Sequence, residues 1–133
     1  MDTPVAHSEI TTVSNAVGQS IQWIRRLVFI NLGLVAVEAL SAGFFLSGYN
    51  HAATIHRSVA LALQLGALTQ AVIAIVLWRR RSAPARVAGA GVVLLILVFL
   101  QAGLGFTKRF WLHVPIGVGI FGGLVQQKSR LDT

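Results

Sequence analysis

Residues 87–106 read VAGAGVVLLILVFLQAGLGF and contain no charged side chain. A run of about 18 or more mostly apolar residues is long enough for a helix to cross the hydrocarbon core of a bilayer. Residues 59–78 form a second run without charge, and residues 27–46 form a third, whose one charged side chain is Glu38. A fourth run, residues 110–127, is near the short limit. The sequence therefore predicts an all-α integral membrane protein with four transmembrane helices.

The composition supports this class. Of the 133 residues 55% are hydrophobic and 11% are charged, whereas soluble domains carry about 25% charged residues. We expect a polar N-terminal segment at 1–23, a transmembrane domain at 24–127 and a basic tail at 128–133. The N-terminal segment lacks the basic cluster and apolar core of a cleavable signal peptide. It is expected either to be disordered or to lie in part on the membrane surface.

The formal net charge of +7 is explained by topology. Basic residues in short loops concentrate on the cytoplasmic side of a membrane. Eight basic residues fall on one side of the four-helix arrangement and three on the other, so both termini are expected in the cytoplasm, with the chain in a cytoplasmic membrane. No nucleic-acid partner is expected. The eight are Arg25, Arg26, Arg79, Arg80, Arg81, Arg86, Lys128 and Arg130, and the three are Arg57, Lys108 and Arg109.

Short loops and similar halves predict how the helices are arranged. The expected loops, 47–58, 79–86 and 107–109, are short, which favours an up-down bundle of antiparallel neighbours. The halves also look alike, because LSAGFF ends the first helix and LQAGLGF ends the third. HRSVALALQLG and HVPIGVGIFGG, which begin at His56 and His113, open the second and fourth helices. We therefore expect a duplicated helical hairpin.

The two repeated histidines predict a cofactor site. His56 and His113 open parallel helices that are diagonal partners in a square bundle, with axes roughly 14 Å apart if neighbours are 8–10 Å apart. This gap fits a flat metal-centred ring with two axial imidazoles, as in haem. A bare zinc or copper ion would need further ligands. The chain has no cysteine, which excludes covalent c-type haem. His7 lies in the tail, and His51 lies in the expected outer loop without a repeat partner.

Other residues near the outer rim have two interpretations. Arg57, Lys108 and Arg109 either pair with haem propionates or anchor the helices at the interface. The histidines themselves have a structural alternative, in which each is hydrogen-bonded to a neighbour. The G-x-G-x-x-G pattern that begins at Gly117 does not indicate a nucleotide, because no strand precedes it and no acidic residue follows about 20 positions later.

Glu38 is the one charged residue within an expected span, and an intramembrane carboxylate is a candidate functional group. It could be a neutral acid that hydrogen-bonds Gln64, Gln70 or Gln101 on another helix. It could also serve a proton relay or a quinone site. A third alternative is a substrate site like that of small four-helix multidrug exporters, which use a lone glutamate in their first helix.

Three short motifs resemble one half of haem A synthase, over residues 28–125. They are the H-R pair at His56, LQAGLG at 100–105 and H-x-P at His113. That family has two four-helix halves, each similar to a b-type cytochrome bundle with histidines on its second and fourth helices. The resemblance implies non-covalent haem b at His56 and His113, used in electron transfer or haem handling.

The resemblance does not extend to haem hydroxylation, so an enzymatic activity is not expected. The catalytic half of the family has a glutamate three residues before the H-R histidine, where this chain has Ala53. Two expectations about partners follow. A half-length chain could pair with itself to rebuild an eight-helix arrangement, or it could join a larger respiratory-type membrane complex. The alternative function is a haem-free accessory subunit of such a complex.

Overall fold

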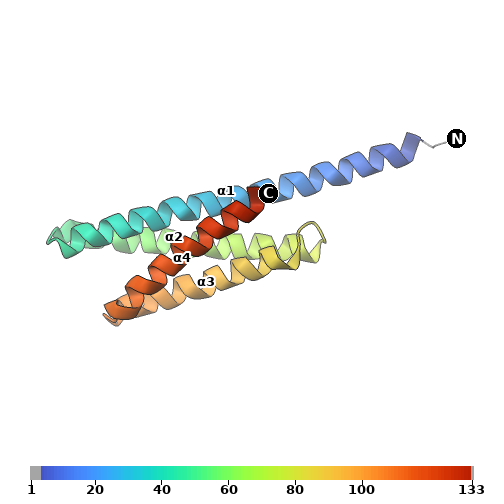
Figure 1. The fold of residues 1–133 in the computed structure, drawn as a ribbon. Helices are drawn as coiled ribbons and strands as arrows, with labels where there is room; N and C mark the ends of the chain where they lie inside the picture. Colours follow the sequence, from blue (N-terminus) through green and yellow to red (C-terminus); the bar gives the residue numbers. More distant parts are fainter. Residues whose placement is uncertain (1–3, 133) are drawn as a thin grey trace.

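The computed structural model describes residues 4–132, and their side chains from residue 18 onward. These residues form four helices, α1 (Pro4–Leu46), α2 (Asn50–Arg79), α3 (Ala85–Phe106) and α4 (Phe110–Asp132), and no strand. The all-α prediction is confirmed. Each helix packs against its neighbours in sequence and α1 also packs against α4, whereas within the described chain the backbones of the two diagonal pairs do not pack against each other and side chains bridge α2 and α4. The arrangement is an up-down bundle in which α2 and α4 are diagonal partners (Figure 1).

Three helical segments are long and apolar enough to cross a membrane, Gly18–Leu46, Asn50–Arg79 and Ala85–Phe106. The prediction of four apolar spans is thus confirmed for three. Helix α4 is long enough but falls short in hydropathy, because His113, Pro115 and the two glutamines near its end interrupt its apolar residues.

The bundle turns large apolar side chains outward and polar ones inward. Phe29 is 67% exposed, Leu61 58% and Phe99 53%, whereas Asn31 and Gln70 are fully buried. In water, large contiguous apolar surfaces are unfavourable and mark contact with a partner or a membrane. The outer surface is therefore compatible with contact with a lipid bilayer.

Helix α1 extends beyond the other three helices at its N-terminal end (Figure 1). The polar segment expected at 1–23 is helical from Pro4 onward. Residues 4–23 therefore form a continuous helix with the first span and not the disordered segment that was one of the two expectations. Near the point where α1 meets the bundle, Arg25 Nε lies 3.0 Å from Asp132 Oδ1, and Arg25 also donates to the backbone carbonyl of Leu131. These contacts join α1 to the end of α4.

The turns at 47–49 and 107–109 share one hydrogen-bond pattern. Ser47 donates to the Gly43 carbonyl from its backbone N–H (3.0 Å) and hydroxyl (2.9 Å), and Thr107 donates to the Gly103 carbonyl from the same two groups (3.0 Å each). The next residue is left-handed in each turn, with φ of 94° at Gly48 and 57° at Lys108. The turn between α2 and α3 has the same backbone pattern and a left-handed Arg81, so only the hydroxyl bonds of Ser47 and Thr107, 60 residues apart, are particular to these two turns and agree with a duplicated hairpin.

The expected outer loop at 47–58 is wrong in length. Helix α2 begins at Asn50, so three residues form the connection. His51 consequently lies in the first turn of α2, and His56 lies six residues into the helix. The turn closes early because Gly48 adopts the left-handed conformation that ends one helix, which lets the next helix start almost at once.

Candidate functional site

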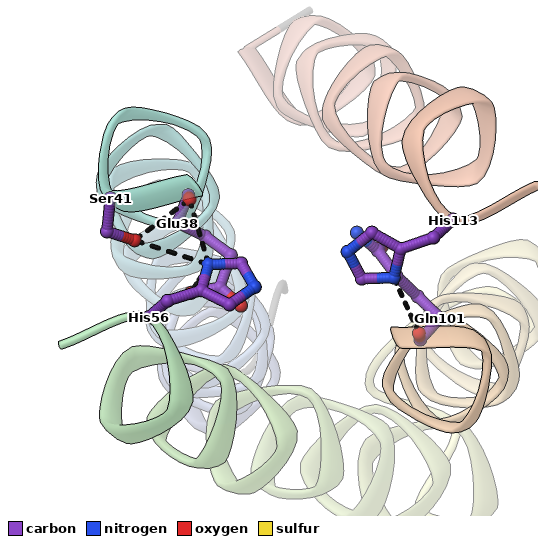
Figure 2. A network of polar contacts seen from close by, with 5 residues as sticks. All are labelled: Glu38, Ser41, His56, Gln101 and His113. Atoms are coloured by element: carbon purple, nitrogen blue, oxygen red, sulfur yellow. Dashed lines mark hydrogen bonds and ion pairs between the residues drawn. The ribbon is translucent and has the colours of Figure 1, made fainter. Parts of the chain in front are cut away.

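His56 on α2 and His113 on α4 face each other across the bundle interior, near the end formed by the 47–49 and 107–109 turns. The centres of their imidazole rings are 6.2 Å apart and their planes are inclined by 64°. One nitrogen of each ring points into the gap between them (Figure 2). The structure thus brings together the two histidines that the repeat singled out.

The Nδ1 atom of His56 is held by helix α1. It lies 3.2 Å from the backbone carbonyl oxygen of Glu38, 3.3 Å from Ser41 Oγ and 3.4 Å from Glu38 Oε2. The Ser41 hydroxyl itself donates to the Glu38 carbonyl at 2.9 Å. Because all three neighbours can accept, Nδ1 carries the ring proton, and the Nε2 lone pair is left free.

The Nδ1 atom of His113 is held in the same way by helix α3. It lies 2.8 Å from the backbone carbonyl oxygen of Gln101, which can only accept, so this Nδ1 also carries the proton. Gly105 lies beside the ring. A Cβ at that position would be 3.0 Å from His113 Cε1 and 3.2 Å from Nδ1. The second glycine of LQAGLG therefore makes room for the imidazole.

The two Nε2 atoms have no hydrogen-bond partner in the described part of the chain. Bonds from a transition metal to an imidazole nitrogen are about 2 Å long and the nitrogen lies about 1 Å from the ring centre, so two imidazoles on opposite sides of one metal ion have centres about 6 Å apart. The observed separation of 6.2 Å fits this arrangement, and it equally fits an ordinary edge-on pair of aromatic rings, whose centres lie about 4.5–7 Å apart.

The donor set restricts which metal centre would fit. Among the described side chains, no group of three or more His, Cys, Asp or Glu residues could hold a metal ion. A protein-only zinc site uses three or four such ligands. Two neutral imidazoles fit a centre whose remaining ligands come with the cofactor, and haem iron with its porphyrin is such a centre.

The histidines differ in depth by one helical turn. His56 lies six residues after the start of α2 and His113 three residues after the start of α4. The repeat aligned on the turns has a period of 60 residues, whereas the histidines are 57 apart. The backbone carbonyls that accept from the two rings differ in the same way. With a period of 60 residues the counterpart of Gln101 is Ser41, and Glu38 lies one turn before Ser41.

None of the three glutamines expected to bond Glu38 does so. Gln70 accepts from Asn31 Nδ2 at 2.8 Å and donates to Gln127 Oε1 at 3.0 Å, which forms a buried polar chain across three helices. The backbone carbonyl of Gln101 accepts from His113. Gln64 is half-buried and has no hydrogen bond to Glu38. The side-chain neighbour of Glu38 is His56. The sequence missed this contact because it depends on how α1 and α2 are rotated against each other.

The remaining candidate residues lie at the same end of the bundle. Arg57, Lys108 and Arg109 are exposed, and no described carboxylate forms an ion pair with them. His51 is exposed on the first turn of α2. His7 lies outside the residues whose side chains the structure describes.

No family model matches the chain, and searches of curated proteins and of solved structures found no match either. The resemblance to haem A synthase therefore stays a prediction from three short motifs. Those motifs meet at the site described above. The H-R pair contains His56, LQAGLG contains both the Gln101 carbonyl and Gly105, and H-x-P contains His113.

Proposed function

We propose that this protein binds one b-type haem between His56 and His113 and acts in electron transfer or haem handling. The observation that carries the proposal is the orientation of the two rings. Each Nδ1–H has an acceptor on a neighbouring helix, and each Nε2 points, without a partner, into the gap between the rings. A histidine kept only for packing does not need a second nitrogen directed at another histidine.

The residues around the rings would each have a defined part. Glu38, Ser41 and the Gln101 carbonyl hold the proton on Nδ1 and so keep Nε2 available as an axial ligand. Arg57, Lys108 and Arg109 at the rim would pair with propionates. Bound haem would supply one-electron redox chemistry. The chain would do no haem hydroxylation, since Ala53 stands where the family's catalytic glutamate is found.

The proposal places the protein in a cytoplasmic membrane as a duplicated hairpin, with α4 as the fourth span and both termini in the cytoplasm. Its support is the outward apolar surface, the two equivalent turns and the basic residues at one end. Residues 47–49 and 107–109, and the histidine site near them, would then face the opposite side of the membrane.

Haem titration of the detergent-solubilised protein tests the proposal. His56→Ala or His113→Ala should each abolish the six-coordinate low-spin spectrum, because one axial imidazole is lost. His51→Ala is the matched control, an exposed histidine five residues before His56 on the same helix, and should bind haem as the unmodified chain does. Equal haem binding by all three variants would overturn the proposed ligand pair.

A second candidate is a haem-free subunit of a larger membrane complex or of a homodimer. One observation favours it. Gly119, Gly122 and Gly123 of α4 are exposed, and a Cβ at any of them would meet nothing within 4 Å. Small residues on an open helix face allow close packing of another membrane helix. The absence of haem in the purified protein would favour this candidate.

A further inference from the structure

We infer a second binding site, for the phosphate-bearing headgroup of an anionic phospholipid, at the turn between α2 and α3. A shallow depression of about 420 Å³, largely open to the surroundings and called the cavity below, lies there. Its walls come from Ile21 of α1, Trp78 of α2 and the connecting residues 81–85. This turn lies at the end of the bundle opposite the other two turns (Figure 1), so the site is separate from the histidines.

The walls of the cavity combine one cation with apolar groups. Arg81, whose guanidinium matches the geometry of a phosphate, and Ser82, whose hydroxyl also donates weakly to the Arg80 carbonyl, are its polar lining residues. Ile21, Trp78 and Pro84 supply apolar surface. Helix α3 also opens on this wall without a side-chain cap. A phosphodiester attached to acyl chains needs this combination of polar and apolar contacts.

The electrostatic surroundings favour an anion. Arg79, Arg80 and Arg86 are exposed close to Arg81 in sequence, and the chain has no acidic residue between Glu38 and Asp132. Asp132 is already engaged by Arg25 and Lys128. Among residues 18–132 no carboxylate forms an ion pair with Arg81, so within this part of the chain its positive charge is not paired.

The ligand is assigned to the membrane because of where the cavity lies. The inference depends on the membrane location proposed above but not on haem. Tryptophans concentrate at the membrane–water interface, and the exposed Trp78 lines the cavity. Basic pockets between helices on the cytoplasmic side bind anionic headgroups. A lipid would place its phosphate against Arg81 and its chains along the apolar helices.

The backbone at Arg81 allows a clean test. Arg81 has φ of 58°, the left-handed conformation that ends α2 and that glycine and asparagine adopt more readily than arginine. Arg81→Asn therefore removes the charge while it keeps or improves the turn. Arg26→Gln is the matched control, because Arg26 has the same charge, belongs to the same basic end and stacks on Trp23 at 5.1 Å outside the cavity.

The experiment measures the thermal unfolding midpoint of the full chain in detergent, with added phosphatidylglycerol, with phosphatidylcholine of the same chains, or with inorganic phosphate. Phosphatidylglycerol should raise the midpoint by several degrees, whereas phosphatidylcholine and phosphate should leave it nearly unchanged. Arg81→Asn should lose at least half of that rise, Arg81→Lys should retain part of it, and Arg26→Gln should retain nearly all of it.

Three results would overturn the inference. An equal rise with phosphatidylcholine would show that the apolar chains alone stabilise the bundle. An equal rise with inorganic phosphate would show a site for free anions. An equal loss in Arg81→Asn and Arg26→Gln would show diffuse attraction to the whole basic end. Because none of these readouts uses haem, failure here is distinguishable from failure of the proposed haem site.

Discussion

The direction of each imidazole is set by a few atoms of the preceding helix. A backbone carbonyl accepts from Nδ1 in both cases, and this choice of tautomer leaves Nε2 as the ligand-competent nitrogen. At His56 a carboxylate and a hydroxyl from α1 lie equally close to Nδ1. At His113 the ring additionally depends on the missing side chain of Gly105.

Gly105→Ala should weaken haem binding. The new methyl group would be 3.0 Å from His113 Cε1 and 3.2 Å from Nδ1, so the ring must shift by a few tenths of an ångström, which disturbs the bond from Nδ1 to the Gln101 carbonyl. Gly103→Ala is the control on the same helix, because a Cβ there meets nothing within 4 Å. Haem affinity measured by optical titration should fall at least tenfold in Gly105→Ala and stay unchanged in Gly103→Ala. Equal affinities would mean that Gly105 has no part in placing the ring.

Glu38→Leu removes the carboxylate 3.4 Å from His56 Nδ1 and keeps the backbone carbonyl that accepts from Nδ1, so it should weaken haem binding about tenfold, the lower end of the range for a group that orients a metal-bound histidine. Glu38→Gln keeps the volume and the hydrogen-bonding capacity of the side chain, so it should fold and retain haem. Helical content by circular dichroism controls for misfolding. If the two variants bound haem equally well, the contact between Glu38 and His56 would have no influence on the ligand.

Sequence reasoning predicted that His56 and His113 lie near each other, but not which groups contact their rings. The meeting of the histidines was predictable because both lie near the start of two parallel helices, although they differ by one helical turn within the repeat. The contact of Glu38 with His56 and the role of Gly105 were not predictable, since they depend on the rotation of one helix against its neighbour. LQAGLG drew attention to Gly105, yet the reason for the glycine is a ring on another helix.

Helix pairs in this bundle meet through small residues and buried amides. At the crossing of α1 and α2, a Cβ on Gly66 would lie 2.2 Å from Asn31 Oδ1. Asn31 is fully buried and fixed by its hydrogen bond to Gln70, so it has little freedom to move away. The buried amide of Asn31 thus fits between α1 and α2 because Gly66, opposite it, has no side chain.

Gly66→Ala should destabilise the protein by about 1–3 kcal/mol, the usual effect of overpacking a filled interior. Gly33→Ala on α1 meets nothing within 4 Å and should be neutral or stabilising by up to about 1 kcal/mol, because alanine favours the helix. Thermal unfolding in detergent compares the two variants. A Gly66→Ala protein as stable as the parent would show that α1 and α2 do not approach as closely as described.

The apolar runs in the sequence predicted that the four helices exist and in which order they follow. They predicted the first and last residues of the helices less well. The start of α2 was placed too late because NHAAT at 50–54 is not apolar, although it is helical. A helix continues beyond the apolar run wherever its backbone groups remain bonded within it. The same reason explains the polar half of α1, which is helical from Pro4 although its composition is unlike that of a membrane span.

At the scale of the whole molecule, the chain has two ends of different character. The N-terminal part of α1, the α2–α3 turn and the C-terminus lie toward one end, and the two equivalent turns with the histidines lie toward the other (Figure 1). The first end also holds eight of the eleven basic residues. This asymmetry predicts that both termini face the cytoplasm.

Reporter fusions after Arg81 and after Arg130 should both report a cytoplasmic location, because both positions belong to the basic end. A fusion after Lys108 should report the opposite side and serves as the control. A signal from the opposite side at Arg81 or Arg130 would contradict the proposed orientation.

The central claim is that haem iron is held between His56 and His113, and one absorption spectrum tests it most directly. The full chain, produced with ample haem and purified in detergent, is measured oxidised and then reduced with dithionite. The account predicts a low-spin spectrum with a b-type α band on reduction, at about one haem per chain. If the purified protein shows no such band, the histidines do not hold haem and the account is contradicted.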